Sequence, residues 1–218
     1  MPPVDLSRAS VFIDFDGTIS VADVGQHLLQ RLAGPEWLRF HDEYDAGEIG
    51  SRECLSSQWE LVQADEATAR AVAREVEIDP GFEPLIDALR AAGAEVMVVS
   101  DGFGFYADQV CAPLDLPVLT NAIDWDTREV LFPNEDRCCP CSTCGTCKQA
   151  PVKDARHRGR TTIVVGDGTS DRKAALLADV VFAKGPLGRW CAINKVPHVP
   201  FATLAEVRAA LVPEESVA

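Results

Sequence analysis

Three short apolar runs, each followed directly by acidic and glycine residues, set the pattern of the chain. They span residues 10–14, 95–100 and 161–166. Nearly continuous apolar runs of this length are typical of strands buried on both faces, and the polar residues after them predict loops at the strand ends. The apolar residues 180–183 predict a further strand.

Helical patterns lie between these strands. One covers residues 83–92 and ends at Gly93, and another covers residues 150–157 with Pro151 in its first turn. Strands that alternate with helices form a parallel sheet covered on both faces. The predicted fold class is therefore α/β, with a doubly wound parallel sheet.

Two regions break this alternation. Residues 20–79 contain helical patterns only, which predicts a small helical cap inserted after the first strand, while residues 1–19 and 80–218 form the core domain. Residues 121–133 carry two short apolar runs around a polar turn, which predicts a pair of short strands. The predicted cap helices cover residues 21–32, 36–44, 52–62 and 66–76.

The composition is typical of a globular protein. Of the 218 residues, 47% are hydrophobic and 25% are charged, which suits one core with a small insert. The chain lacks the roughly 18 consecutive apolar residues that a membrane span needs, and residues 1–10 lack the basic start and apolar run of a signal peptide. We therefore expect a cytoplasmic protein without a membrane partner.

Acidic residues dominate the charge of the chain. The formal net charge is −14 and the pI is near 4.6. With no lysine- and arginine-rich stripe, such a chain repels nucleic acid, so nucleic-acid binding is not expected. The same field repels a phosphorylated metabolite, and any phosphate site therefore needs a bound cation and local hydrogen-bond donors.

Acidic and hydroxyl side chains stand at the carboxyl end of each of the first three predicted strands. Asp14 and Asp16 belong to the first strand end, Ser100 to the second, and Asp167 and Asp171 to the third. Ligands of open α/β sheets bind beyond these ends. Each residue alone could be a helix cap or turn residue, but four carboxylates in one crevice repel one another unless a cation lies among them. Hard oxygen ligands favour Mg²⁺ over zinc.

Four short motifs agree in order and spacing with those of a known family. They are Asp14-Phe15-Asp16-Gly17-Thr18, Val99-Ser100, a later lysine, and Gly166-Asp167-Gly168-Thr169-Ser170-Asp171. Through these motifs, most of the chain resembles the haloacid dehalogenase-like (HAD) phosphatases. The resemblance implies a magnesium-dependent phosphatase that acts on a small phosphorylated metabolite through an aspartyl-phosphate intermediate.

The resemblance also implies a role for each acidic residue. Asp14 would be the nucleophile, and Asp16 would be the general acid for the leaving group and later the base for water. Mg²⁺ would be held by Asp14, by the main-chain carbonyl of Asp16 and by Asp167, with Asp171 as a ligand through water or a partner of the ligands. Because Asp14 and Asp16 are two residues apart, both can project into the same crevice.

Phosphate binding is assigned in the same way. The phosphoryl oxygens would be bound by the Ser100 side chain and by backbone amides near Asp101, Gly102, Gly17 and Thr18. A lysine should also counter their charge, and Lys148 and Lys153 are the candidates. The family places this lysine before or at the start of the helix that leads to the last motif, which favours Lys148, whereas Lys153 is expected on a solvated helix face.

Five cysteines crowd into the predicted loop at residues 134–148. They are Cys138, Cys139, Cys141, Cys144 and Cys147. A disulfide framework is not expected in the cytosol, where thiols are usually kept reduced. Four thiolates at this spacing could hold a structural zinc ion and fix Lys148. The alternative is a set of ordinary thiols, prone to form disulfides on isolation.

Further matches favour one branch of the family. Residues 144–148, 35–37 and 182–184 resemble the methionine-salvage phosphatases, which act on 2-hydroxy-3-keto-5-methylthiopentenyl-1-phosphate and are close to the phosphoserine phosphatases. Asp101 departs from the pattern, because glycine is usual at that position. The cap would close over the site and read the leaving group. Its candidate contacts, each of which could equally be a core or solvated residue, are Asp23, His27, Trp37, Arg52 and Trp59.

Other interpretations stay open. A phosphoserine-type phosphatase or a phosphotransferase would use the same acidic motifs. A zinc-binding module could keep the fold without turnover, although the presence of the complete set of acidic residues and of Lys148 argues against it. The sequence is compatible with a monomer or a homodimer.

Overall fold

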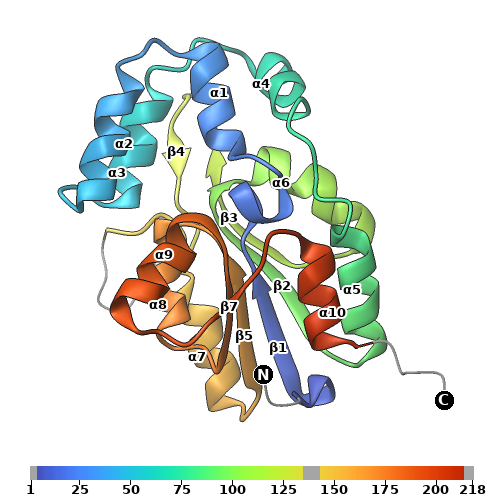
Figure 1. The fold of residues 1–218 in the computed structure, drawn as a ribbon. Coiled ribbons are helices and arrows are strands. Elements are labelled where there is room, and N and C mark those ends of the chain that lie inside the picture. The colour runs from blue at the N-terminus through green and yellow to red at the C-terminus, as the bar shows by residue number, and fades with distance from the viewer. Residues whose placement is uncertain (1–3, 135–142, 214–218) are drawn as a thin grey trace.

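A seven-stranded sheet lies at the centre of the computed structural model, which describes residues 4–134 and 143–213 (Figure 1). The strand order is β4-β3-β2-β1-β5-β6-β7, and the pairs are parallel except for β3 with β4. The strands are β1 (Ala9–Ile13), β2 (Glu95–Phe103), β3 (Val118–Ile123), β4 (Val130–Leu131), β5 (Thr161–Gly166), β6 (Val180–Ala183) and β7 (Val199–Pro200). The predicted α/β fold class is confirmed.

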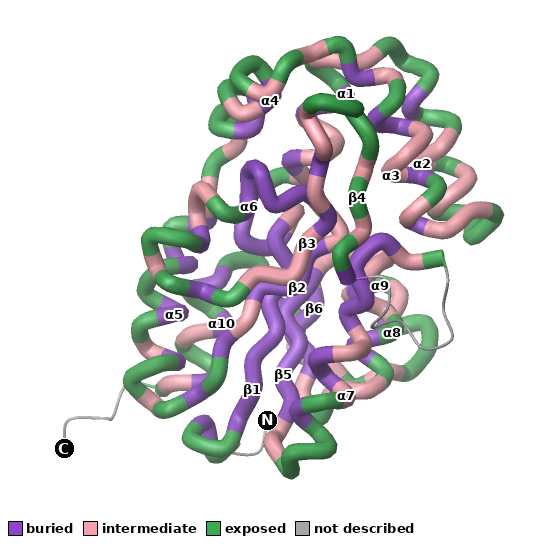
Figure 2. Tube along the Cα trace, turned by 180° about the vertical axis from the view of Figure 1, so that it is seen from behind, coloured by how far each residue is buried: buried purple, intermediate pink, exposed green. Residues whose placement is uncertain are grey.

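Helices cover both faces of this sheet, and the middle strands are buried between them (Figure 2). Successive side chains of a strand point to opposite faces. Val11 and Ile13 therefore join the larger apolar cluster, which includes residues of α5 and α10, whereas Phe12 packs with Val152 and Ala155 of α7. The helices are α5 (Phe82–Ala91), α6 (Gly104–Cys111), α7 (Gln149–His157), α8 (Arg172–Ala175), α9 (Gly185–Asn194) and α10 (Leu204–Leu211). Within the described ranges, no helix is long and apolar enough to cross a membrane.

The helical insert predicted after the first strand is also confirmed, and it lies beyond the carboxyl ends of the central strands (Figure 1). Its helices pack as two pairs, α1 with α4 and α2 with α3. At its base, Ser20 and Ile78 form an isolated antiparallel bridge where the chain leaves and re-enters the core. The insert consists of α1 (Val24–Leu32), α2 (Trp37–Ala46), α3 (Ser51–Trp59) and α4 (Glu66–Ala73). The division of the chain at residues 20 and 79 stays a prediction.

Strand β2 differs from its predicted form. The pattern ended it at Ser100, but the strand continues to Phe103, with a shift in its register with β3 between Val99 and Phe103. Pairing of Phe103 with Asn121 extends the strand across the irregular segment, so tertiary pairing overrides the local preference of Asp and Gly for turns. This bulge lies at the carboxyl edge of the sheet.

Candidate active site

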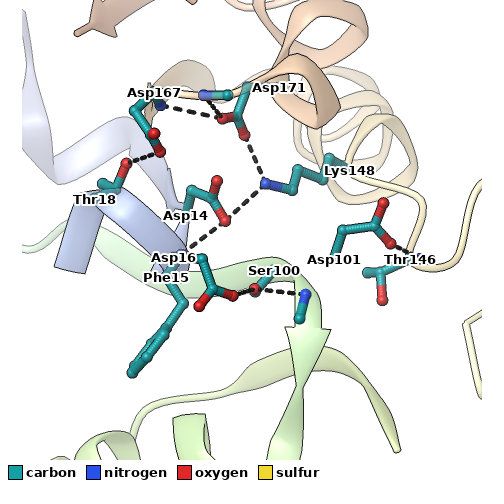
Figure 3. Close-up of polar contacts among 12 residues, drawn as sticks. Asp14, Phe15, Asp16, Thr18, Ser100, Asp101, Thr146, Lys148, Asp167 and Asp171 are labelled. Atoms are coloured by element: carbon teal, nitrogen blue, oxygen red, sulfur yellow. Dashed lines mark hydrogen bonds and ion pairs between the residues drawn. The ribbon is translucent and has the colours of Figure 1, made fainter. Parts of the chain in front are cut away.

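Three carboxylates from two strand ends meet at this edge. Oxygen atoms of Asp14, Asp167 and Asp171 all lie within 4.8 Å of one another. Asp14 directly follows β1, Asp167 directly follows β5, and Asp171 ends the short turn before α8 (Figure 3). The arrangement brings together three of the residues that the sequence assigned to metal binding.

The Lys148 ammonium lies between two of these carboxylates. Its Nζ atom is 2.7 Å from Asp14 Oδ1 and 2.8 Å from Asp171 Oδ1, and only 5% of the lysine side chain is exposed. Burial alone would lower the pKa of Lys148, but the charges of Asp14 and Asp171 raise it above its ordinary value. The ammonium therefore stays charged. Of the two candidate lysines, Lys148 is the one that makes these contacts, while Lys153 is half-buried on α7.

Backbone geometry after β1 brings Asp14 and Asp167 together. Asp14 Oδ1 accepts a hydrogen bond of 2.7 Å from the Phe15 N–H, and Asp167 Oδ1 accepts one of 2.9 Å from the Thr18 hydroxyl. Gly17, between them, has a φ of +71°, and a Cβ atom at that position would lie 2.5 Å from Asp167 Oδ2. Glycine is therefore required at this close approach.

Asp171 is held by the loop that follows β5. Its Oδ2 atom accepts hydrogen bonds from the backbone N–H groups of Asp167, at 3.2 Å, and Gly168, at 3.0 Å. Its Oδ1 atom contacts Lys148. Asp171 thus links the Asp167 loop to the lysine.

The acidic group has the properties of a cation site. Burial raises the pKa of Asp14 well above its ordinary value, the nearby Asp171 charge raises it further, and Lys148 opposes both. Burial and the Asp171 charge also raise the pKa of Asp167, to about 6. A divalent ion among these groups relieves the repulsion, and three hard oxygen donors suit Mg²⁺. Asp14, Asp167 and Asp171 therefore fit magnesium.

Asp16 lies outside this acidic group, against the cap and α6. Its Oδ2 atom accepts hydrogen bonds from the Tyr106 hydroxyl, at 2.8 Å, and the Ser100 hydroxyl, at 3.3 Å, and its Oδ1 atom accepts one of 3.0 Å from the Val24 N–H. Burial, followed by the charge of Asp23, raises the pKa of Asp16 to about 7. Asp16 can therefore hold a proton near neutral pH. The predicted role of its main-chain carbonyl in metal binding stays a prediction.

The bulge of β2 supplies the remaining predicted phosphate contacts. Ser100 Oγ accepts a hydrogen bond of 2.9 Å from the Gly102 N–H. A Cβ atom on Gly102 would lie 2.2 Å from Asp16 Oδ2, so a larger residue would displace Asp16. The Asp101 carboxylate does not join the acidic group but accepts a hydrogen bond of 2.7 Å from the Thr146 N–H (Figure 3). Phosphate binding by these residues stays a prediction.

A cavity of about 240 Å³ lies between the cap and the acidic group. Its lining includes Asp14, Asp16 and Asp167 from the core and the cap residues Asp23 and Trp59. The other candidate cap contacts do not line it: His27 pairs with Glu75 at 2.9 Å, Trp37 is buried against His41, and Arg52 donates to the Cys144 carbonyl. Tyr106, which also lines the cavity, was missed, since no local pattern marks a tyrosine that reaches a carboxylate 90 positions away.

Zinc receives no support from the part of the chain that the structure describes. There, the one group of potential metal ligands is the acidic one. Three of the five cysteines, Cys138, Cys139 and Cys141, lie outside the described residues. Cys147 is buried, and Cys144 Sγ lies 3.7 Å from Lys173 Nζ.

Known proteins resemble the chain in sequence and fold. The model of the haloacid dehalogenase-like hydrolase family matches residues 11–176. A 2-hydroxy-3-keto-5-methylthiopentenyl-1-phosphate phosphatase of Brevibacillus brevis is 28% identical over 204 residues, which cover 90% of this chain and 92% of that protein.

Two solved structures share the fold. A HAD family hydrolase of Salmonella enterica subsp. enterica serovar Typhi has a TM-score of 0.74 at 16% identity and covers 98% of this chain and 73% of its own. A phospho-aspartyl intermediate analogue of phosphoserine phosphatase has a TM-score of 0.71 at 19% identity. The match covers 93% of this chain and 97% of that chain. At such identities, the likeness establishes a common architecture.

Proposed function

The chain belongs to the haloacid dehalogenase-like hydrolase family, and from this premise we propose that it hydrolyses a small phosphate monoester through a phosphoryl group carried on Asp14. The observation that carries the proposal is the buried Lys148 ammonium between Asp14 and Asp171, next to Asp167 and the cavity. Phosphoryl transfer depends mainly on positioning and on countering the charge of the phosphoryl oxygens. This group of residues can do both.

Asp14 is the nucleophile in this mechanism. The Phe15 N–H and Lys148 hold Asp14 Oδ1, and among the described residues no donor contacts Oδ2. Oδ2 attacks phosphorus, the bond from phosphorus to the ester oxygen breaks, and Asp14 carries the phosphoryl group. Lys148 offsets negative charge on both the carboxylate and the phosphoryl oxygens.

Asp16 handles the proton. With a pKa of about 7 it holds a proton in much of the population near neutral pH, and it donates this proton to the leaving oxygen. The resulting carboxylate then accepts a proton from water. That water attacks phosphorus, which releases orthophosphate and restores Asp14.

Magnesium would be held by Asp14, Asp167 and Asp171. When bound, the ion supplies positive charge that neutralises the phosphoryl group and lets the negatively charged chain accept an anionic substrate. The protein residues keep their own tasks. Thr18 orients Asp167, and the loop N–H groups of Asp167 and Gly168 orient Asp171.

The cavity wall supports a leaving group with an apolar part. Leu28, Leu29, Leu55, Trp59 and Phe103 line it, and no lysine or arginine stands among the described residues of the lining. A thioether tail is compatible with such a wall, whereas an amino-acid carboxylate finds no lysine or arginine among the described residues of the lining. We therefore propose the methylthiopentenyl phosphate named in the relatives as the substrate.

Phosphoserine is the second candidate, because the fold resembles that of phosphoserine phosphatase. Asp23 lines the cavity and could face the substrate ammonium group. Among the described residues of the lining, no lysine or arginine offers the substrate carboxylate an equivalent contact. We expect phosphoserine to be the poorer substrate.

One assay tests both levels of the proposal. Phosphate release is measured from p-nitrophenyl phosphate, phosphoserine and the methylthiopentenyl ester, with Mg²⁺ and with EDTA. We expect metal-dependent turnover, fastest with the methylthiopentenyl ester. Asp14→Asn should lower kcat by at least about 10³-fold, because the nucleophile is lost.

Asp87→Asn is the matched control, since it makes the same chemical change on the exposed face of α5. It should leave every rate unchanged. Equal turnover by wild type and Asp14→Asn would exclude the proposed mechanism. A methylthiopentenyl ester rate no higher than that of p-nitrophenyl phosphate would exclude the proposed substrate but leave the phosphatase assignment intact.

A further inference from the structure

Asp101 has an acidic side chain next to a phosphate site, where its charge opposes the proposed reaction. The carboxylate is turned away from the acidic group and toward the segment that precedes α7 (Figure 3). Asp101 lines the same cavity as Asp14 and Asp167, but its carboxylate hydrogen-bonds to this segment. The segment consists of residues 143–148 and is here called the lysine loop, because it ends at Lys148.

Asp101 and Asn121 hold this loop from two sides. Asp101 Oδ1 accepts hydrogen bonds from the Thr146 N–H, at 2.7 Å, and from Asn121 Nδ2, at 3.2 Å. Asn121 Nδ2 also donates to the Asp101 carbonyl at 2.7 Å, and Asn121 Oδ1 accepts from the Thr146 hydroxyl at 3.1 Å. The four bonds form a closed network that joins the ends of β2 and β3 to Thr146.

Asn121 and Thr146 are buried, whereas Asp101 is half-buried. Asn121 has no exposed surface, and Thr146 is 2% exposed. A Cβ atom on Gly145 would lie 2.5 Å from Asp101 Oδ1 and 2.8 Å from Asn121 Nδ2, so only glycine allows the loop to approach this closely. Losing one of these hydrogen bonds leaves a polar group of a buried residue unpaired, which costs free energy.

The same loop also contacts the cap. Gly145 N–H donates to Ser51 Oγ at 3.0 Å, and Arg52 N–H donates to the Thr143 carbonyl at 3.1 Å. The loop therefore touches the first turn of α3, the tips of β2 and β3 and, through Lys148, the acidic group. Of these contacts, the bonds of Thr146 with Asp101 and Asn121 lie closest to Lys148 along the chain, two residues before it.

We propose that Asp101 is a positioning residue that acts through Lys148: its carboxylate fixes Thr146 and so holds the ammonium between Asp14 and Asp171. The effect on turnover rests on the proposed function, whereas the anchoring of the loop does not. Asp101 lines the cavity, and in this role two N–H donors bind its carboxylate oxygen Oδ1. The role also accounts for the departure from glycine at position 101.

The test compares Asp101→Ala with Asp101→Asn, which keeps an oxygen acceptor for the Thr146 N–H. With p-nitrophenyl phosphate and Mg²⁺, we expect Asp101→Ala to lower kcat by about 10- to 100-fold, because small misplacements of a catalytic group have effects of this size. Asp101→Asn should recover most of the loss. If Asp101→Ala does not fold, Asn121→Ala replaces it in the test. That variant removes the Asn121 bonds of the network and should also lower kcat.

A double-mutant comparison separates positioning from general stabilisation. If Asp101 acts through Lys148, then adding Asp101→Ala to the Lys148→Met variant should lower kcat by less than about twofold further. The reason is that the effects of residues that act through one another do not add. If Asp101→Ala lowers kcat by the same factor in wild type and in Lys148→Met, the proposal is overturned. Wild-type kcat in Asp101→Ala would also overturn it.

Hydrogen exchange gives a readout that does not depend on activity. Amides of residues 143–148 should exchange faster in Asp101→Ala than in wild type. Asp124→Ala is the matched control, because Asp124 Oδ1 also accepts two backbone N–H groups but lies in an exposed turn, and it should leave the loop unchanged. If the amides of residues 143–148 exchange at the same rate in Asp101→Ala and in wild type, the proposal is overturned. If the wild type is inactive but these amides exchange faster in Asp101→Ala, the result counts against the proposed function alone.

Discussion

The two ends of the central strands carry the same kind of ion pair in opposite surroundings. At the carboxyl end, Lys148 pairs with Asp14 and Asp171, and the three side chains are only 2–6% exposed. At the amino end, Glu95 pairs with Arg158 at 2.9 Å and with Arg160 at 3.1 Å, and the Glu95 side chain is 47% exposed.

Burial, more than the presence of an ion pair, determines how strongly these charges interact. At the amino end, water screens the charges, and the pair contributes little beyond local order. At the carboxyl end, desolvation makes unpaired charge costly, so the balance among three carboxylates and one ammonium changes with any added ion or phosphate. We therefore expect the buried cluster to respond more strongly to a ligand than the exposed one.

Removing the buried lysine should have the largest effect. We expect Lys148→Met to lower kcat by about 10²- to 10³-fold, as loss of a group that stabilises developing charge does. Without Mg²⁺, it should also reduce the free energy of unfolding by about 3 kcal/mol, because the carboxylates are left unpaired. Steady-state kinetics and urea unfolding measure the two effects.

The pH dependence of that destabilisation has a definite sign. Burial and mutual repulsion raise the folded-state pKa values of Asp14 and Asp167, and a raised carboxyl pKa favours the folded state at low pH and disfavours it as pH rises. The stability defect of Lys148→Met should therefore grow as pH rises from 5 to 8 and shrink when Mg²⁺ is added. Lys153→Met, a lysine five residues further along the chain in α7, is the control and should show neither defect. A similar defect there would contradict the special status of the buried pair.

Removing one hydroxyl should have an intermediate effect. Tyr106→Phe deletes the 2.8 Å hydrogen bond to Asp16 while keeping the ring. Because this bond holds the proposed general acid, we expect kcat for an alkyl phosphate to fall about 10-fold. The rate with p-nitrophenyl phosphate, whose leaving group needs little protonation, should hardly change.

The same variant should shift the pH profile. The Tyr106 hydrogen bond lowers the pKa of Asp16 against the raising effect of burial, so its loss raises that pKa. A general acid must be protonated, and the alkaline limb of kcat/KM should therefore move to higher pH. An equal loss of rate for both esters, with an unmoved limb, would show that Tyr106 only supports the fold.

Local pattern was sufficient for β1, β5 and β6 and for the acidic motifs. Asp14, Asp16, Asp167 and Asp171 follow β1 and β5, whose apolar runs are plain in the sequence, and parallel strands align their carboxyl ends at one edge. The tertiary partners of these residues were beyond such reasoning. Tyr106 reaches Asp16 across 90 positions, so the contact depends on how α6 packs.

The bulge in β2 and the contacts of the lysine loop also depend on tertiary contacts that local pattern does not predict. Asp101 and Gly102 read locally as a strand end, and only pairing of Phe103 with Asn121 reveals the bulge. Thr146 contacts Asp101 across 45 positions. A carboxylate that is used to anchor a loop looks, in one sequence, the same as one that binds a ligand.

The smallest effect is expected at the exposed end. Burial would raise the pKa of Glu95, but hydrogen bonds from Arg158 and Ser10 and the charge of Arg160 hold it below its ordinary value of 4.5. The stability this contributes is present above pH 4.5 and is lost as pH falls through the lowered folded-state pKa. We expect Glu95→Gln to reduce the free energy of unfolding at pH 7 by about 0.5 kcal/mol, with screening by solvent included, and to leave kcat unchanged. Urea unfolding should show a smaller difference in the free energy of unfolding between Glu95→Gln and wild type below pH 4 than at pH 7. A loss of stability as large as that of Lys148→Met would mean that exposure does not separate the two ends of the sheet.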